Sequence, residues 1–145
     1  FPSHPHRGFE TVTYMIEGAM EHRDSVGNSG RLRPGSAQWM TAGRGIVHSE
    51  MPKQERGLMW GYQLWVNLPA SKKMTPPRYQ DIAPERIPEL DRDGACVRVV
   101  AGNAFDTHGP VSGIAVDPVF VDIALAKGAS VSHVLPTRSI AVVIS

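Results

Sequence analysis

Glycine and proline interrupt this sequence so often that a long helix has little room. The 145 residues include 14 glycines and 12 prolines. Between them lie short runs rich in β-branched and aromatic residues, which favour strands. The clearest runs are residues 10–16, 36–41, 57–68, 97–101 and 119–125. Short strands separated by turns are typical of an all-β sandwich or barrel. Residues 69–88 contain five prolines, which exclude a continuous helix or a central strand, so we expect an ordered crossing loop there.

The overall composition narrows the functional classes. Hydrophobic residues make up 41% and charged residues 20%, as in globular proteins with a buried core. The formal net charge of +1, with scattered basic residues, argues against direct nucleic-acid binding. No apolar run approaches the ~20 residues of a membrane span, and no basic-then-apolar leader is visible. Cys96 is the only cysteine and fits a small buried residue in a reducing compartment. We therefore expect a cytoplasmic protein, or a nuclear one in a eukaryote.

Two pairs of polar residues have the spacing of a metal site. His4 and His6 are two residues apart, as are His48 and Glu50. On a strand, side chains two apart point to the same face, so two such strands could direct three imidazoles and one carboxylate into one cavity. This ligand set suits Fe, Mn, Ni, Zn or Cu better than Ca or Mg. A glycine-rich stretch directly before His48 permits a tight bend close to the site.

A simpler alternative is a set of ordinary surface histidines. One His-x-His pair is weak evidence for a metal, and the second pair strengthens it. His22, His108 and His133 have no such partners, and we expect each on the surface or in a hydrogen bond. Gly-x-Ser-x-Gly motifs, glycine-rich phosphate loops and Cys-His pairs are all missing, so hydrolase triads and nucleotide sites have no support.

Several long motifs closely resemble the pirin family of the cupin superfamily. They are HPHRGFETVTY (4–14), EHRDS (21–25), QWMTAGRGIVHSE (38–50), QLWVNLP (63–69) and PRYQ (77–80). The resemblance weakens after about residue 113. It implies two β-barrel cupin domains and one metal site, in the N-terminal domain, usually holding iron. By position in the motifs, the resemblance implies that His4, His6, His48 and Glu50 are the ligands.

Glu10 is a rival for the carboxylate ligand, because it follows the first histidine pair much as in the first metal motif of cupins. In general cupins a Pro-x-Gly stands close before the histidine of the second motif, whereas here Pro34-Gly35 is far upstream of His48. We therefore assign the ligand to Glu50 and expect Glu10 behind the ligands.

The resemblance also predicts the fold and the domains. We expect an all-β cupin (double-stranded β-helix, or jelly-roll) barrel in a bicupin truncated at both ends. Residues 1–112 would be the N-terminal metal-binding cupin domain without its opening strands. Residues 113–145 would be the incomplete start of the C-terminal cupin domain, with strands at 119–125 and 138–144 and no second metal set.

Two functions follow from the resemblance. The first is a quercetin (flavonol) 2,3-dioxygenase that uses Fe(II), with Mn, Ni, Zn or Cu as alternative metals. There the metal would take the flavonol oxygen, Glu50 or another base would receive its proton, and dioxygen would cleave the heterocycle. The candidate substrate-binding residues are Arg7, Gln38, Trp39 and Met40. The second function is a non-enzymatic, metal- or redox-dependent regulatory protein that binds another protein rather than nucleic acid. An apolar cavity beside the metal would favour the enzyme.

Overall fold

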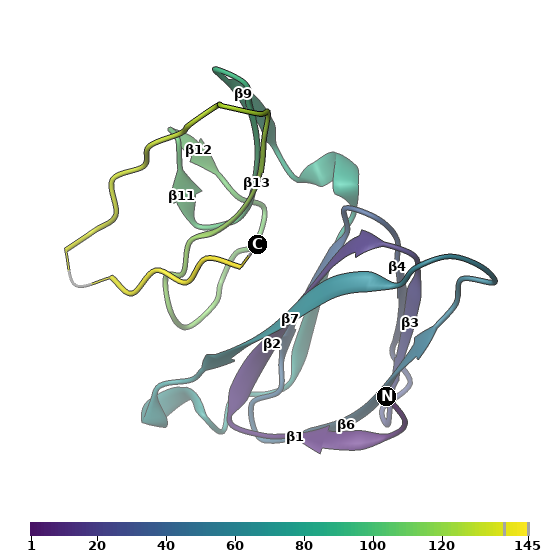
Figure 1. The fold of residues 1–145 in the computed structure, drawn as a ribbon. Coiled ribbons are helices and arrows are strands. Elements are labelled where there is room, and N and C mark those ends of the chain that lie inside the picture. The colour runs from purple at the N-terminus through teal and green to yellow at the C-terminus, as the bar shows by residue number, and fades with distance from the viewer. Residues whose placement is uncertain (138, 145) are drawn as a thin grey trace.

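The computed structural model describes residues 1–137 and 139–144, whose regular secondary structure is almost entirely β-strand (Figure 1). The strands are β1 (His4–His6), β2 (Phe9–Glu17), β3 (Met20–Asp24), β4 (Ser29–Leu32), β5 (Ala37–Thr41), β6 (Ile46–Pro52), β7 (Trp60–Asn67), β8 (Arg78–Ile82), β9 (Glu89–Arg92), β10 (Ala95–Ala101), β11 (Asn103–Ala104), β12 (Thr107–His108) and β13 (Phe120–Leu125). Two short 3-10 helices are η1 (Ala70–Lys72) and η2 (Pro84–Arg86). No helix in the described part of the chain is long and apolar enough to cross a membrane.

The first eight strands form two antiparallel four-stranded sheets. Their orders are β1-β6-β3-β4 and β7-β2-β5-β8, and Figure 1 shows them as the two walls of one barrel. The crossing loop predicted for 69–88 contains β8, which lies at the edge of its sheet. An edge strand bounded by prolines is compatible with their missing N–H donors.

The two faces of the second sheet differ in polarity. Val12 and Tyr14 of β2 pack on the outer face with Trp39 of β5, against Val100 and neighbouring residues beyond the barrel. The alternate residues of β2 point between the two sheets, where Thr13 meets Glu50. The sheet thus buries its apolar face against the second part of the chain and leaves a polar face toward the barrel interior.

The second part is built around the three-stranded sheet β13-β10-β9. Val97 of β10 lies opposite Ile123 of β13 on one side and Leu90 of β9 on the other. Hydrogen bonding therefore crosses the predicted boundary between residues 112 and 113. That division into domains stays a prediction.

The strand predicted at 138–144 is not formed in the part that the structure describes. Residues 139–144 have no strand, and Ile140, Val142 and Val143 are exposed. Arg138 and Ser145 lie outside the described residues. A run of apolar residues that favour β-structure forms a strand only where a neighbouring strand can form hydrogen bonds with its backbone.

Candidate metal centre

The pairing of β1 with β6 unites the two histidine pairs. His4 lies directly opposite His48 in this antiparallel ladder, and His6 lies opposite Ile46. Since His4 and His6 share a face, all three rings meet, and one nitrogen from each lies within 4.8 Å of the others. His6 and His48 are buried, and His4 is half-buried.

The distances between the Nε2 atoms show whether the three rings could bind one ion. His4 Nε2 lies 3.0 Å from His6 Nε2 and 3.1 Å from His48 Nε2. On an octahedron, these two edges place the nitrogens about 2.1–2.2 Å from the centre, near the metal–imidazole distance of about 2.0–2.1 Å. On a tetrahedron, the same edges would place them only about 1.9 Å away. Both values lie near a metal–imidazole bond length, so the three imidazoles can bind one shared divalent ion.

The protonation states of the rings also suit a metal. Burial, and then the neighbouring His4, lower the pKa of His6. Burial lowers the pKa of His48 to about 4, although the nearby Glu50 acts in the opposite direction. Both rings are thus neutral at neutral pH, the form that binds metals. The Nδ1 of His4 lies 2.8 Å from the Pro2 carbonyl oxygen, and donation there leaves the Nε2 lone pair free to face the cluster.

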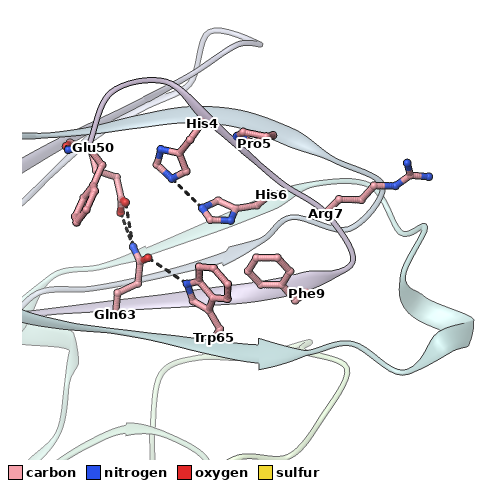
Figure 2. Close-up of a pocket in the computed structure, with 9 residues that line it drawn as sticks. His4, Pro5, His6, Arg7, Phe9, Glu50, Gln63 and Trp65 are labelled. Carbon is pink, nitrogen blue, oxygen red and sulfur yellow. Dashed lines mark hydrogen bonds between the residues drawn. The ribbon is translucent and has the colours of Figure 1, made fainter.

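Glu50 lies beside the three rings but is held by the opposite sheet. Its side chain is buried, and Gln63 Nε2 donates to its two oxygens at 2.8 and 3.0 Å (Figure 2). Glu50 is not part of the set whose ligand atoms all lie within 4.8 Å of one another. The structure thus brings the three histidines together and places the predicted fourth ligand next to them, on a hydrogen-bonded carboxylate that would have to turn toward an ion.

An open hollow of about 340 Å³ lies over the cluster. Its lining residues are Phe1, His4, Pro5, His6, Arg7, Phe9, Glu50, Gln63 and Trp65. The Trp65 ring is 66% exposed and lies 5.6 Å from the His6 ring and 4.8 Å from the Phe9 ring, between centroids. Figure 2 shows these aromatic rings beside the histidines. An aromatic wall next to a polar floor suits a planar, hydroxylated ligand.

Only Arg7 of the four predicted substrate residues lines this hollow. Gln38 donates from Nε2 to Asp81 Oδ1 at 2.7 Å, and Met40 packs with Ile46 and Ala42. Trp39 lies in the apolar core on the outer face of β5. None of these three lines the hollow, and their role in substrate binding stays a prediction. All of β5 is buried, so neither its sequence nor its burial shows which residues face the metal.

Glu10 also lies apart from the cluster. Its neighbours across β2 are Thr41 and Val66, and Thr41 Oγ1 donates to Glu10 Oε1 at 2.6 Å. Glu10 alternates with Thr11 and Thr13, so it lies on the outer face of the sheet. This position agrees with its exclusion from the ligand set.

The other histidines have varied surroundings. His22, expected on the surface or in a hydrogen bond, is only 1% exposed and stacks on Tyr79. The His108 ring lies 2.8 Å from Asn103 Oδ1, and the His133 ring packs on Phe105.

Sequence reasoning missed five residues of the hollow: Phe1, Pro5, Phe9, Gln63 and Trp65. The alternation within residues 57–68 does place Gln63 and Trp65 on one face. The pattern alone does not show that this face of the strand is directed toward the histidines.

Comparison with known proteins agrees with the fold. A family model described as Pirin matches residues 1–66, which include His4, His6, His48 and Glu50. A pirin-like protein of Caulobacter vibrioides is 55% identical over 130 residues, which cover 88% of this chain and 47% of that protein.

The chain belongs to the pirin family.

Solved structures extend this pirin-family assignment to the fold. A quercetin 2,3-dioxygenase from Acinetobacter baumannii matches with a TM-score of 0.82 and 44% identity, covering 88% of this chain and 46% of that one. The bacterial pirin YhhW from Escherichia coli in complex with nickel(II) matches with a TM-score of 0.55 and 28% identity, covering 72% of this chain and 60% of that one. The expected all-β cupin fold is confirmed. The chain spans about half the length of the relatives that it matches.

Proposed function

We propose that this chain carries the metal centre of an Fe(II)-dependent dioxygenase that acts on a flavonol such as quercetin. The observation that carries the proposal is the convergence of three imidazole nitrogens beside Glu50 at the floor of an open, aromatic-walled hollow. The similarity to a quercetin 2,3-dioxygenase of Acinetobacter baumannii supports the reaction class.

His4, His6, His48 and Glu50 would hold the ion. Fe(II) is the proposed metal, with Mn, Ni, Zn or Cu as alternatives, and the nickel complex of the related pirin supports a divalent ion. A reducing cytoplasm, the predicted setting, would keep iron as Fe(II). When bound, the ion supplies Lewis-acid polarisation of a substrate oxygen and redox chemistry toward dioxygen.

The residues of the chain bind the substrate and move its proton. The exposed ring of Trp65, backed by Phe9, offers a stacking surface for a flavonol, and Arg7 lies at the same hollow. Glu50 accepts the proton of the flavonol hydroxyl. Because the Glu50 carboxylate is buried, the transfer takes place away from bulk water.

Oxygen consumption tests this function. The protein is reconstituted anaerobically with Fe(II), and dioxygen uptake is measured with and without quercetin. We expect quercetin-dependent uptake that falls in Trp65→Ala. Trp60→Ala is the matched control, since Trp60 lies on the same strand and outside the hollow. Uptake that does not depend on quercetin would contradict the proposal.

A non-enzymatic regulatory role is the second candidate. The 66% exposure of Trp65 beside the metal cluster favours it, because exposed aromatic residues are common at protein-binding surfaces. In that function a partner protein would cover the hollow in a metal-dependent way. Tight Fe(II) binding with no quercetin-dependent oxygen uptake would favour this role.

A further inference from the structure

Gln63 forms the contact that joins the predicted fourth ligand to the opposite wall of the barrel. Glu50 belongs to β6 of one sheet, whereas Gln63 belongs to β7 of the other. Gln63 Nε2 lies 2.8 and 3.0 Å from the two oxygens of Glu50 and 3.2 Å from Thr13 Oγ1 (Figure 2). The position of the carboxylate therefore depends on a side chain that the metal itself would not touch.

Trp65 decides which end of the Gln63 amide faces Glu50. The indole N–H of Trp65 donates to Gln63 Oε1 at 3.3 Å. An indole nitrogen can only donate, and an ionised carboxylate can only accept. With a donor on one side and an acceptor on the other, the amide has one satisfactory orientation, in which its NH₂ group points at Glu50.

We propose that Gln63 is a positioning residue that sets the place of the Glu50 carboxylate as the fourth metal ligand, with Trp65 holding the Gln63 amide in orientation. The inference rests on the ligand role of Glu50 in the proposed function. With two oxygens, Glu50 can offer one to the ion and leave the other on the Gln63 amide. A carboxylate held in this way would bind the ion through one oxygen only.

The exposure of Gln63 separates this role from a purely structural one. Glu50 is 2% exposed, whereas Gln63 lies at the open side of the hollow. Gln63 is exposed, and substitutions at exposed positions usually change stability little, so Gln63 variants should fold. In such a variant the buried Glu50 carboxylate loses a hydrogen-bond donor, so holding it in its present position costs free energy. We therefore expect the Gln63 variants to lose metal affinity rather than the fold.

Calorimetric titration with Co²⁺ tests the proposal through a double-mutant cycle. We expect Gln63→Leu to weaken Co²⁺ binding about 10–100-fold, as is typical when a group that orients a ligand is lost. In a Glu50→Ala background, Gln63→Leu should have no further effect, because its action passes through Glu50. Trp65→Phe, which keeps a ring and removes the N–H, should give a smaller loss in the same direction. Gln80→Leu is the matched control, since Gln80 accepts a bond from the Ser112 amide away from the cluster.

Two outcomes would overturn the proposal. One is unchanged Co²⁺ affinity and an unchanged visible Co²⁺ spectrum in Gln63→Leu. The other is an equal loss in the wild-type and Glu50→Ala backgrounds, which would mean that Gln63 acts without Glu50. The Co²⁺ titration contains neither flavonol nor dioxygen, so its result does not depend on the dioxygenase reaction. Failure of oxygen uptake with an intact coupling between Gln63 and Glu50 would refute the enzyme and leave the positioning role standing.

Discussion

Replacing Gly43 by alanine should destabilise the protein more than the same change at Gly45. Both glycines have positive φ, +54° and +135°, so alanine is strained at either position. Their surroundings differ. A Cβ at Gly43 would overlap the Thr75 carbonyl oxygen, whereas at Gly45 the nearest atom would be the His6 carbonyl oxygen at 3.9 Å. The turn before β6 is therefore tightly packed at one glycine and open at the other.

The excess cost at Gly43 comes from the displacement of Thr75. Backbone strain contributes about 1–3 kcal/mol at each site. It is larger at Gly45, because a φ of +135° is nearly exclusive to glycine, whereas +54° lies in the left-handed region that other residues sometimes adopt, and it therefore offsets part of the excess at Gly43. Moving Thr75 weakens the hydrogen bond that the Arg44 amide donates to its carbonyl oxygen at 2.9 Å, worth about 1 kcal/mol. Overpacking adds about 1–3 kcal/mol more. We expect Gly43→Ala to cost about 1 kcal/mol or more beyond Gly45→Ala, or about 2–4 °C in Tm.

Urea unfolding of the metal-free variants measures this difference. Gly27→Ala is a further control, because Gly27 has a φ of +97° and nothing within 4 Å of the added Cβ. Gly43→Ala should have the lowest urea midpoint at an unchanged m-value. It should also bind Co²⁺ more weakly, since β6 with His48 begins directly after this turn. Equal midpoints for Gly43→Ala and Gly45→Ala would refute the argument from packing.

Three further predictions concern the cluster and the core. His48→Ala should weaken Co²⁺ binding by more than about 10–100-fold, which is the loss typical of residues that only orient a ligand. His108→Ala should leave Co²⁺ affinity unchanged, and equal affinities of the two variants by calorimetry would contradict the ligand role of His48. Trp39→Phe should lower the free energy of unfolding in urea by about 1–2 kcal/mol and keep Co²⁺ affinity, since Trp39 packs in the apolar core on the outer face of β5. Lost Co²⁺ affinity with normal stability would show that Trp39 reaches the metal. Burial lowers the pKa of His48 to about 4 from the ordinary 6.5, so the unfolded chain binds more protons between these values. The metal-free protein should lose up to about 3 kcal/mol as pH falls from 6.5 to 4, and His48→Gln should flatten that slope in pH-dependent urea titrations; parallel slopes would refute it.

Local patterns were enough for several features of this protein. The frequent glycines and prolines predicted short strands, and the regular secondary structure is almost entirely β-strand. The alternation in β7 separated Tyr62 and Leu64 from Gln63 and Trp65, because successive side chains on a strand point to opposite faces. The same two-residue period placed His4 with His6, and His48 with Glu50, on common faces. These properties depend only on neighbours in the chain, so sequence can determine them.

The joining of these local pieces was decided by tertiary structure. The register that sets His4 opposite His48 joins residues 44 positions apart. The face of β5 on which Trp39 lies could not be assigned from an alternation of buried and exposed residues, because every residue of that strand is buried. The contact of Gln63 with Glu50 exists only because two separate sheets face each other across the barrel. The alternation of side chains follows from the geometry of a single strand. The register between strands, and the face that each strand turns toward the core, depend on which apolar surfaces pack together and which strand edges form hydrogen bonds in the whole fold.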